Sequence, residues 1–307
     1  MDIDALRSLV ARLIETKELT LYPWTEELSF LKDELGLQNR QGNRIGWDES
    51  PTLIDEKLVS KALDLDHFYR SLVSSSTNTE LLERGSKQSI GRNLVVTEWQ
   101  VGGRGRRGRT WNSAFAKHLT FSYGHRCALD MSQLGGLSLV VGLVVCEVIN
   151  RRIGQSVASL KWPNDLLCDD KKVCGILVEL SPSDGFVEAV IGIGLNIELS
   201  EKEMLLIDQP VTDLRSLGIE TSRSDLLIEL VNTLQVFLAR FEESGFEPFI
   251  DAFNKCHIYH GRTCNIHQGD TIITGRVEGV DHDGALILST ENGIRSFHGG
   301  EVSLRAT

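Results

Sequence analysis

Gly103-Arg104-Gly105-Arg106-Arg107-Gly108-Arg109-Thr110-Trp111 is the stretch of this sequence that says most about its fold and its ligand. Glycine permits a close approach of the backbone, and arginine offers a planar fork of donors that matches carboxylate or phosphate. Four neighbouring positive charges repel one another unless a counter-charge lies between them. The stretch therefore predicts a loop that closes over a ligand with several negative oxygens, rather than a solvated basic turn.

The same stretch formally matches the dinucleotide-binding pattern G-x-G-x-x-G, and it follows a strand-like apolar run, Leu94-Val95-Val96. After Gly108, however, the chain continues with Arg109-Thr110-Trp111-Asn112-Ser113. A dinucleotide site would need an apolar helix here, with its N-terminus directed at the pyrophosphate. The residues that follow Gly108 therefore argue against a nicotinamide or flavin site.

Two further segments place polar groups at the ends of predicted strands. Lys161-Trp162-Pro163-Asn164-Asp165 follows the strand-like run Val157-Ala158-Ser159-Leu160. Lys172 follows a charged turn that contains Asp169-Asp170, and it precedes a buried strand whose Gly175 lets a ligand lie against the backbone. Taken alone, Lys172 is more typical of a solvated turn lysine.

A third segment, Ile191-Gly192-Ile193-Gly194-Leu195-Asn196-Ile197, reads as an apolar strand. Its two glycines lie on the same side by period-two alternation, and Asn196 follows on that side. A flat ligand could pack on such a surface, although a close crossing of two chain segments would need glycine equally.

In order and spacing, these segments closely resemble those of bacterial biotin protein ligases, which attach biotin to a lysine of the biotin carboxyl carrier protein. The resemblance covers about residues 53 to 307 and includes Ser76-Thr77-Asn78 and Gly299-Gly300-Glu301-Val302-Ser303-Leu304-Arg305. It implies an α+β protein with a central mixed β-sheet catalytic domain of the biotin/lipoyl ligase type over residues 53–257. A small SH3-like β-barrel is expected over residues 258–307, and a small, mostly helical segment over residues 1–52.

The resemblance also implies a two-step reaction, in which biotin and ATP give biotinyl-5′-AMP and an acceptor lysine then takes the acyl group. Neither step needs a protein nucleophile, and the marked segments hold no obvious Ser-His-Asp or Cys-His arrangement. The resemblance implies that Arg106 and Lys172 are catalytic. Arg106, with Arg104, would hold the carboxylate and the adenylate phosphate, and Lys172 would balance the charge that develops in phosphoryl transfer. ATP implies magnesium, for which Asp165 is the nearest candidate ligand.

The binding residues follow from the same motifs. Biotin is expected to contact Ser76, Thr77, Asn78, Gln100, Gly103, Arg104, Arg106, Lys172 and Gly175. The nucleotide is expected to contact Arg107, Arg109, Trp111, Asn164, Lys172, Asn196 and Arg305, with Trp111 stacked on adenine. Arg305 is equally consistent with an exposed tail residue. Residues 102–110 bury little apolar surface, so we expect them to be mobile without ligand and to order over the adenylate.

The chain departs from the family pattern near the biotin end. Ser75 stands where the family usually has an acidic residue, and Ala114 and Ala116 replace a common Pro and Gly. Lys117-His118 stands where smaller or amide residues are usual, and His118 is interpreted as a strand-end histidine rather than a local hydrogen-bonding residue. These changes concern the binding of biotin and leave the adenylation groups intact.

Composition fits a globular cytoplasmic protein of 307 residues with 41% apolar residues. The longest apolar run, near Leu137 to Val145, is too short to span a membrane, and the first residues lack a signal pattern. Six cysteines without framework spacing favour a reducing compartment. Cys256-His257, His260 and Cys264 could be written as a zinc set, but they lack a C-x-x-C element. The net charge of −11 concerns solubility more than partners.

Helical periodicity marks Leu6, Leu9, Val10 and Leu13, and a second amphipathic piece runs from Thr25 to Leu35. Two long helices are predicted over Leu134–Ile153 and Ser224–Phe241, the second with its apolar residues on one face. From about Tyr259, short apolar runs between Gly, Asp and Asn turns predict an all-β end. Many family members carry an N-terminal winged helix that binds DNA.

Residues 36–47 resemble the wing, but the stretch for a recognition helix is too short. Residues 1–60 hold seven Lys/Arg against twelve Asp/Glu, which argues against DNA binding and favours a degenerate winged helix.

Two other classes of function stay open beside the ligase. A lipoate or octanoyl ligase or transferase shares the broader fold, but the arginine-rich loop differs from the loop of those families. A binding-only regulator would not need Arg106 and Lys172. The expected partner is the biotin carboxyl carrier protein of acetyl-CoA carboxylase, and the resemblance also allows a homodimer. Neither DNA nor a membrane is expected as a partner.

Overall fold

Two long strands, β11 (Lys171–Ser183) and β12 (Phe186–Asn196), form the centre of a seven-stranded sheet in this computed structural model. The structure describes residues 2–20, 31–85, 89–183, 185–269, 271–299 and 302–306. The other strands of the sheet are β4 (His67–Ser71), β5 (Asn93–Thr97), β8 (His118–Cys127), β9 (Ala158–Lys161) and β10 (Asp165–Cys168). Their order is β4-β5-β8-β12-β11-β10-β9, and β4 and β5 are the parallel pair. The predicted mixed sheet is confirmed.

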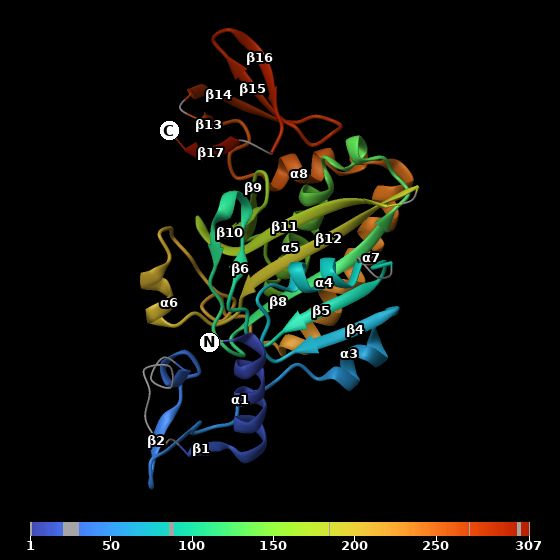
Figure 1. Cartoon of the computed structure of the whole chain (residues 1–307). Coiled ribbons are helices and arrows are strands. Elements are labelled where there is room, and N and C mark those ends of the chain that lie inside the picture. Colours follow the sequence, from blue (N-terminus) through green and yellow to red (C-terminus); the bar gives the residue numbers. More distant parts are fainter. Residues whose placement is uncertain are drawn as a thin grey trace.

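Helices cover both faces of this sheet (Figure 1). α5 (Leu137–Ile153) and α7 (Arg223–Ser244) pack on one face, and α4 (Thr77–Gly85) lies on the other. Both long helices agree with the predicted ranges to within three residues. The shorter helices are α3 (Glu56–Ala62), α6 (Glu201–Leu206) and α8 (Ile250–Cys256).

The capping residues and the apolar periodicity of α7 explain its length. Ser222 caps the first turn by accepting a hydrogen bond from the backbone N–H of Asp225, and Gly245 ends the helix with φ 65°. Its apolar residues recur every three or four positions, so one face is buried against α5 and the sheet. The buried residues of this face are Leu226, Leu227, Leu230, Val231, Leu234, Leu238 and Phe241.

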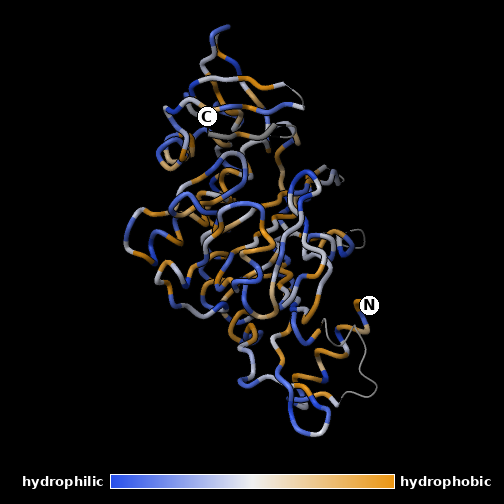
Figure 2. Tube along the Cα trace, turned by 90° about the vertical axis from the view of Figure 1, so that its left-hand side faces the viewer, coloured by the Kyte–Doolittle hydropathy of each residue, from blue (hydrophilic) through white to orange (hydrophobic). Residues whose placement is uncertain are grey.

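The helical stretch Met131–Ile153 is long and apolar enough to cross a membrane by composition, but most of it is buried in the protein. It combines a short 3-10 turn, Met131–Leu134, with α5. Its apolar side chains pack between α7 and strands β9 to β11. Figure 2 shows hydrophobic stretches running through the interior of the body. Core burial therefore accounts for its composition.

A tight hairpin turn joins β10 to β11 and determines where Lys172 lies. Asp169 and Asp170 have φ values of 50° and 60°, the left-handed conformation that a two-residue hairpin turn of this kind needs. Aspartate tolerates this conformation better than most residues do. The turn places Lys172 on β11 next to Asp165 on β10, as described below.

The C-terminal part is all-β, as predicted. Its strands are β13 (Thr263–Gln268), β14 (Thr271–Val280), β15 (Leu286–Thr290), β16 (Gly293–Phe297) and β17 (Val302–Ala306). They form an antiparallel sheet in the order β16-β15-β14-β13-β17. Its buried side chains belong to the same apolar core as the central sheet, and Trp162 Nε1 donates a hydrogen bond to the carbonyl of Gly284 at 3.1 Å. This module is thus joined to the loop after β9.

The N-terminal part begins with the predicted helix, α1 (Ile3–Thr16), which buries Leu6, Val10 and Leu13. Strands β1 (Glu18–Thr20), β2 (Gln38–Arg40) and β3 (Arg44–Gly46) form an antiparallel sheet in the order β1-β3-β2. The hairpin β2–β3 lies within the stretch that resembles a wing. Most of the second predicted helix, Thr25 to Leu35, lies outside the described residues, and residues 31–34 are helical.

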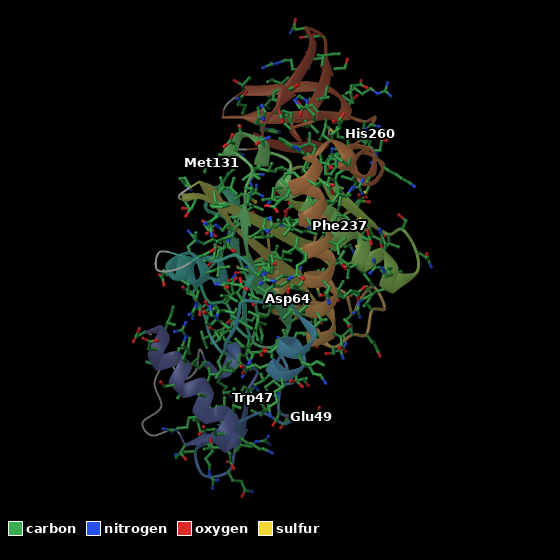
Figure 3. The ribbon with its side chains drawn as sticks, turned by 90° about the vertical axis from the view of Figure 1, so that its right-hand side faces the viewer. Trp47, Glu49, Asp64, Met131, Phe237 and His260 are labelled. Atoms are coloured by element: carbon green, nitrogen blue, oxygen red, sulfur yellow. The ribbon has the colours of Figure 1, made fainter. Side chains whose placement is uncertain are left out.

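The apolar core of this N-terminal part extends into the part of the chain that carries the central sheet. Val73, Trp99 and Phe115 are at most 5% exposed and pack with the apolar residues of α1, β1 and β3. Phe115 stacks on Trp47, with ring centroids 5.6 Å apart and planes 12° from parallel. Figure 3 marks Trp47 in the N-terminal part, below the central sheet. The N-terminal part therefore shares its core with residues that adjoin the site described next.

Candidate active site

A cavity of about 460 Å³ opens over β11 and β12, at the ends of the strands that the sequence marked. This volume is within the usual range for a small-molecule site. Of the residues predicted to bind or react, those that line it are Ser76, Thr77, Asn78, Gln100, Arg104, Arg106, Arg107, Arg109, Trp111, Asn164, Asp165, Lys172, Gly175 and Asn196. Segments more than 100 residues apart in the sequence thus meet at one place.

Two of the predicted site residues are not in this set of lining residues. Gly103 is buried behind the lining, where a side chain would collide with the carbonyl oxygen of Trp111 and with Gln100 Nε2. Its role in the structure is to permit this close packing. Arg305 lies on β17 opposite Asn265, and its side chain lies outside the described part of the structure. The neighbouring Leu304 lines the cavity.

The glycines of β12 form the floor of the cavity. A Cβ atom on Gly192 would lie 2.2 Å from Asn78 Oδ1, and one on Gly194 would lie 2.5 Å from Trp111 Cε2. Gly194 pairs with Gly175 across the two strands, and the Trp111 indole lies against both glycines. The glycines therefore accommodate protein side chains that stand over the floor.

A hydrogen-bonded polar group lies at the Gly192 end of the floor. Gln100 Oε1 accepts a hydrogen bond from the backbone N–H of Thr77 at 2.9 Å. Ser122 Oγ lies 2.7 Å from Thr77 Oγ1 and 2.6 Å from Asn78 Oδ1. These side chains are all buried, so their orientations are set before any ligand arrives.

Glu179 belongs to this end of the site, although the sequence did not single it out. Its Oε2 accepts a hydrogen bond from Asn78 Nδ2 at 2.7 Å, and its Oε1 lies 3.4 Å from Arg104 Nη2. Arg104 also donates to Thr79 Oγ1 at 2.9 Å. The sequence did offer one signal for Glu179, a carboxylate within an apolar strand, because such a residue is seldom half-buried without a polar partner. Its partners lie on other elements and could not be identified from the neighbouring sequence.

The arginine-rich stretch forms a small hairpin over the cavity. Strands β6 (Gly103–Arg104) and β7 (Thr110–Trp111) pair, and Gly105 N–H donates to the carbonyl of Arg109 at 2.7 Å. The turn has φ values of 58° at Arg107 and 71° at Gly108. Four arginines therefore approach the cavity from one side.

Arg106 is the most buried of these four arginines. Its Nη1 lies 3.4 Å from Asn164 Oδ1, and Asn164 is in turn held by its hydrogen bond to the carbonyl of Ile176 at 2.9 Å. Burial lowers the pKa of Arg106, and the charge of Arg107 lowers it further, whereas Asp165 raises it. The guanidinium stays charged but lacks full compensation, so an anionic ligand would stabilise it.

Lys172 is half-buried and paired, which corrects the expectation that such a lysine taken alone is solvated. Its Nζ lies 2.7 Å from Asp165 Oδ1, and both side chains are about one-sixth exposed, at 16% and 15%. The ammonium also lies 5.9 Å from the centroid of the Trp111 ring. Asp165 keeps Lys172 directed into the cavity, where it could meet a second negative group.

A segment that the sequence did not mark covers the Asn196 end of the cavity. It contributes Leu206, Ile207, Asp208, Gln209 and Val211, which follow or end α6. Lys172 N–H donates to the carbonyl of Pro210 at 2.9 Å, so this segment reaches the strand that carries the lysine. No sequence motif marks this segment, because it lines the cavity only as a result of the chain path that brings it back to the sheet.

The arrangement suits charge stabilisation rather than covalent catalysis by the protein. Burial raises the pKa of the Cys174 thiol beneath the floor far above its usual value, so this thiol is no nucleophile. In the suggested zinc set, His257 Nδ1 faces the carbonyl of Leu160 at 2.9 Å and Cys256 Sγ the carbonyl of Ala252 at 2.7 Å. Among the described residues, the group with metal-ligand spacing is a different one, His125, Cys127 and Glu242.

Comparisons with known proteins agree with this geometry. Residues 71–196 match the biotin/lipoate A/B protein ligase family, and residues 259–305 match the biotin protein ligase C-terminal domain. The bifunctional ligase/repressor BirA of Escherichia coli (strain K12) is 37% identical over 255 residues, which cover 83% of this chain and 79% of BirA. The biotin–[acetyl-CoA-carboxylase] ligase of Mycobacterium tuberculosis is 30% identical over 70% of this chain and 80% of that protein.

A solved structure of the biotin protein ligase from Aquifex aeolicus in complex with biotin and ATP is similar, with a TM-score of 0.65 and 30% sequence identity. The match covers 80% of this chain and 99% of that one. Sequence relatives, family models and fold thus agree, and the chain belongs to the biotin protein ligase family.

Proposed function

We propose that this protein activates biotin with ATP to biotinyl-5′-AMP and transfers the biotinyl group to a lysine of the biotin carboxyl carrier protein of acetyl-CoA carboxylase. The observation that carries the proposal is a cavity with two different ends, joined by a glycine floor. One end presents the uncharged hydrogen-bonding side chains of Ser76, Thr77, Asn78 and Gln100, and the other end is cationic. The uncharged side chains suit a polar ring system such as the ureido ring of biotin. The cationic end suits a carboxylate and a phosphate that must approach each other.

β12 gives the scale of this cavity. Asn78 stands over Gly192, Trp111 stands over Gly194, and Asn196 follows on the same face. At about 3.3 Å per residue, the floor from Gly192 to Asn196 is about 13 Å long. We assign the Gly192 end to biotin and the Asn196 end to the nucleotide, with the reacting groups between them near Arg106 and Lys172.

The first step forms a bond between a carboxylate oxygen of biotin and the α-phosphorus of ATP, and pyrophosphate leaves with the bonding electrons. Both reactants are anions, so cationic groups must offset their repulsion. Arg106 and Lys172 would do so from fixed positions, set by Asn164 and Asp165, at little cost in reorganisation. In the second step, the acceptor amine attacks the acyl carbon and AMP leaves.

Magnesium fits the residues present at the cationic end. Asp165 and Asp208 both line the cavity, and Mg²⁺ in nucleotide sites is often held by one or two carboxylates together with phosphate oxygens. Asp165 would then have to share its oxygens between Lys172 and the ion. The metal would supply further neutralisation of the phosphate charges.

The setting proposed for this reaction is the cytoplasm, where the carrier protein and ATP occur together. Support comes from the cysteines, which are all free in the structure, as expected in a reducing compartment. A homodimer is a further proposal. We do not propose a DNA-binding role, since acidic residues outnumber basic ones over residues 1–60.

The proposal is tested by measuring pyrophosphate release from the purified protein with MgATP and either biotin or lipoate, followed by addition of a biotin carboxyl carrier domain. We expect release that depends on biotin, and labelling of one lysine on the added domain. Release with lipoate but not with biotin would point to a lipoyl ligase. Biotin binding without pyrophosphate release would point to a sensor.

Arg106→Gly is expected to leave a folded enzyme that loses its adenylate. The substitution removes a half-buried cation from the middle of the cavity, and a hydrogen bond to a charged group contributes about 1.5–3 kcal/mol. We therefore expect biotinyl-AMP to dissociate about 10 to 100 times faster, with labelling of bystander lysines. Labelling is measured with and without an inert lysine-rich protein.

Arg106→Ala and Arg106→Lys separate two explanations of such leakage. If the side chain retains the adenylate, the alanine variant leaks like the glycine variant and the lysine variant leaks less. If only Arg106→Gly leaks, added backbone freedom is the cause and the assignment of the guanidinium to the adenylate is wrong.

A further inference from the structure

The α6 segment, defined here as Leu199–Thr212, leaves the sheet after β12 and returns to it beside Lys172. Its base is fixed, because Leu199 N–H donates to Asp213 Oδ2 at 2.9 Å and Asn196 Nδ2 donates to the carbonyl of Thr212 at 3.1 Å. Its outer half, from Leu206 to Val211, lines the Asn196 end of the cavity. In Figure 1, α6 stands out from the side of the body.

Apolar packing does not explain how α6 keeps its place. The helix has six residues, and helices this short are unstable without tertiary support. Met204, Leu205 and Leu206 are 43%, 87% and 65% exposed, and Glu203 is the buried residue of the helix. The ion pair of Lys202 with Glu34 is exposed to solvent, where such pairs contribute little. Backbone hydrogen bonds of 2.9 Å join Lys172 to Pro210 and to Thr212 and hold the far end of the segment. The side-chain support of the helix itself comes through Glu203.

Glu203 joins the start of α6 to the central sheet. One carboxylate oxygen lies 2.7 Å from His118 Nε2, and the other accepts hydrogen bonds from the N–H and the hydroxyl of Ser200 at 2.9 and 2.8 Å. Burial raises the pKa of Glu203, but the hydrogen bond and charge of His118 and the bonds from Ser200 outweigh it and lower the pKa to about 2. The carboxylate is thus ionised, and the His118 N–H donates to it.

His118 is fixed on the other side of this bond. It begins β8 opposite Asn196 of β12, is 1% exposed, and its carbonyl accepts a hydrogen bond from Arg223 Nη1 at 3.2 Å. The interpretation of His118 as simply a strand-end residue is wrong, because it makes a buried hydrogen bond to a residue 85 positions away. It connects the rigid sheet to an otherwise weakly held helix.

We propose that His118 is a positioning residue for the nucleotide end of the cavity, which through its hydrogen bond to Glu203 holds the α6 segment over the bound ATP. This inference rests on the proposed function, since ATP is the ligand concerned. Without the bond, the α6 segment would move more freely, and ATP would have to order it on binding. Biotin, at the other end of the floor, would be affected much less.

The test compares three variants by pyrophosphate release at varied ATP and varied biotin. For His118→Leu, we expect the KM for ATP to rise about tenfold or more and the KM for biotin to change less than about twofold. His118→Gln keeps an N–H donor and should recover most of the ATP affinity. His125→Leu is the matched control, because His125 lies on the same strand with its Nε2 3.4 Å from Glu242 Oε1, but away from the cavity. It should leave both KM values unchanged.

Hydrogen exchange of the same proteins without ligand gives a readout that does not depend on activity. Peptides within residues 199–212 should exchange at least about tenfold faster in His118→Leu, while peptides of β11 and β12 stay unchanged. If His118→Leu does not fold, Glu203→Gln tests the same bond, since it removes the charge while keeping the length of the side chain.

The results that would overturn the proposal are specific. One is an unchanged KM for ATP in a folded variant. Another is an equal rise of both KM values together with faster exchange throughout the sheet, which would show a general structural defect. If the parent protein releases no pyrophosphate with biotin, the proposed function fails. Exchange in residues 199–212 would then still decide whether His118 anchors α6.

Discussion

Lys172→Gln is expected to lower the rate of biotin-dependent pyrophosphate release by about 100- to 1000-fold, the usual effect of removing one preorganised group that stabilises the transition state. The substitution removes the ammonium that lies 2.7 Å from Asp165 and 5.9 Å from the Trp111 ring centroid. It also leaves Asp165 as an uncompensated negative charge, which would repel the phosphates. The rate is measured in single-turnover experiments at saturating biotin and ATP, so that binding does not limit it.

Lys171→Gln is the matched control for this prediction. Lys171 precedes Lys172 on β11, is exposed, and points to the opposite face of the strand. Both substitutions remove one positive charge from the same turn, so a general effect of net charge would appear in both. Equal rates for the two variants would show that Lys172 does not act on the reacting phosphates.

Gly192→Ala is expected to weaken biotin binding by about 100-fold. The new Cβ atom would lie 2.2 Å from Asn78 Oδ1, well inside contact distance. Asn78 is held by Ser122 at 2.6 Å and Glu179 at 2.7 Å, so it cannot move aside without losing these bonds. Two hydrogen bonds, one of them to a carboxylate, amount to about 3 kcal/mol. Isothermal titration with biotin measures the effect.

A double-mutant cycle with Asn78→Ser shows whether this collision is the cause. Serine is shorter and leaves room for the added methyl group, so Gly192→Ala should cost much less in the Asn78→Ser background than in the parent. If the methyl group costs the same in both backgrounds, then Gly192 contacts the ligand itself and the assignment of Asn78 as its neighbour has no bearing on affinity.

Local patterns in the sequence were sufficient for much of the fold. The periodicity of α1 and α7 follows from the one face that each helix buries, whereas α5 is apolar on nearly all sides because it is buried on nearly all sides. The Asp169-Asp170 turn follows from backbone conformations that few residues tolerate. The sequence also predicted that the two glycines of β12 lie on one side of a strand, where a flat ligand could pack. Sequence alone could not show that Asn78 and Trp111 stand on that surface, because both come from segments far away along the chain.

Contacts between distant segments account for what could not be predicted. Glu179 and Asn78 are 101 residues apart, and the hydrogen bond of Glu203 to His118 joins residues that carry no shared motif. Lys172 taken alone resembled a solvated lysine because its partner Asp165 faces it only once the β10–β11 hairpin has formed. The roles of the individual site residues therefore remain predictions, which the experiments described above test.

The shared core beneath the N-terminal part has a consequence for how this chain can change in evolution. A module with its own core can be lost from a gene while its neighbour stays intact. Here Val73, Trp99 and Phe115 precede or follow the segments that line the cavity, and apolar residues of α1, β1 and β3 cover them. Loss of residues 1–52 would expose these three apolar side chains to water unless other substitutions arose first. Selection for catalysis alone would thus be enough to retain this part of the gene.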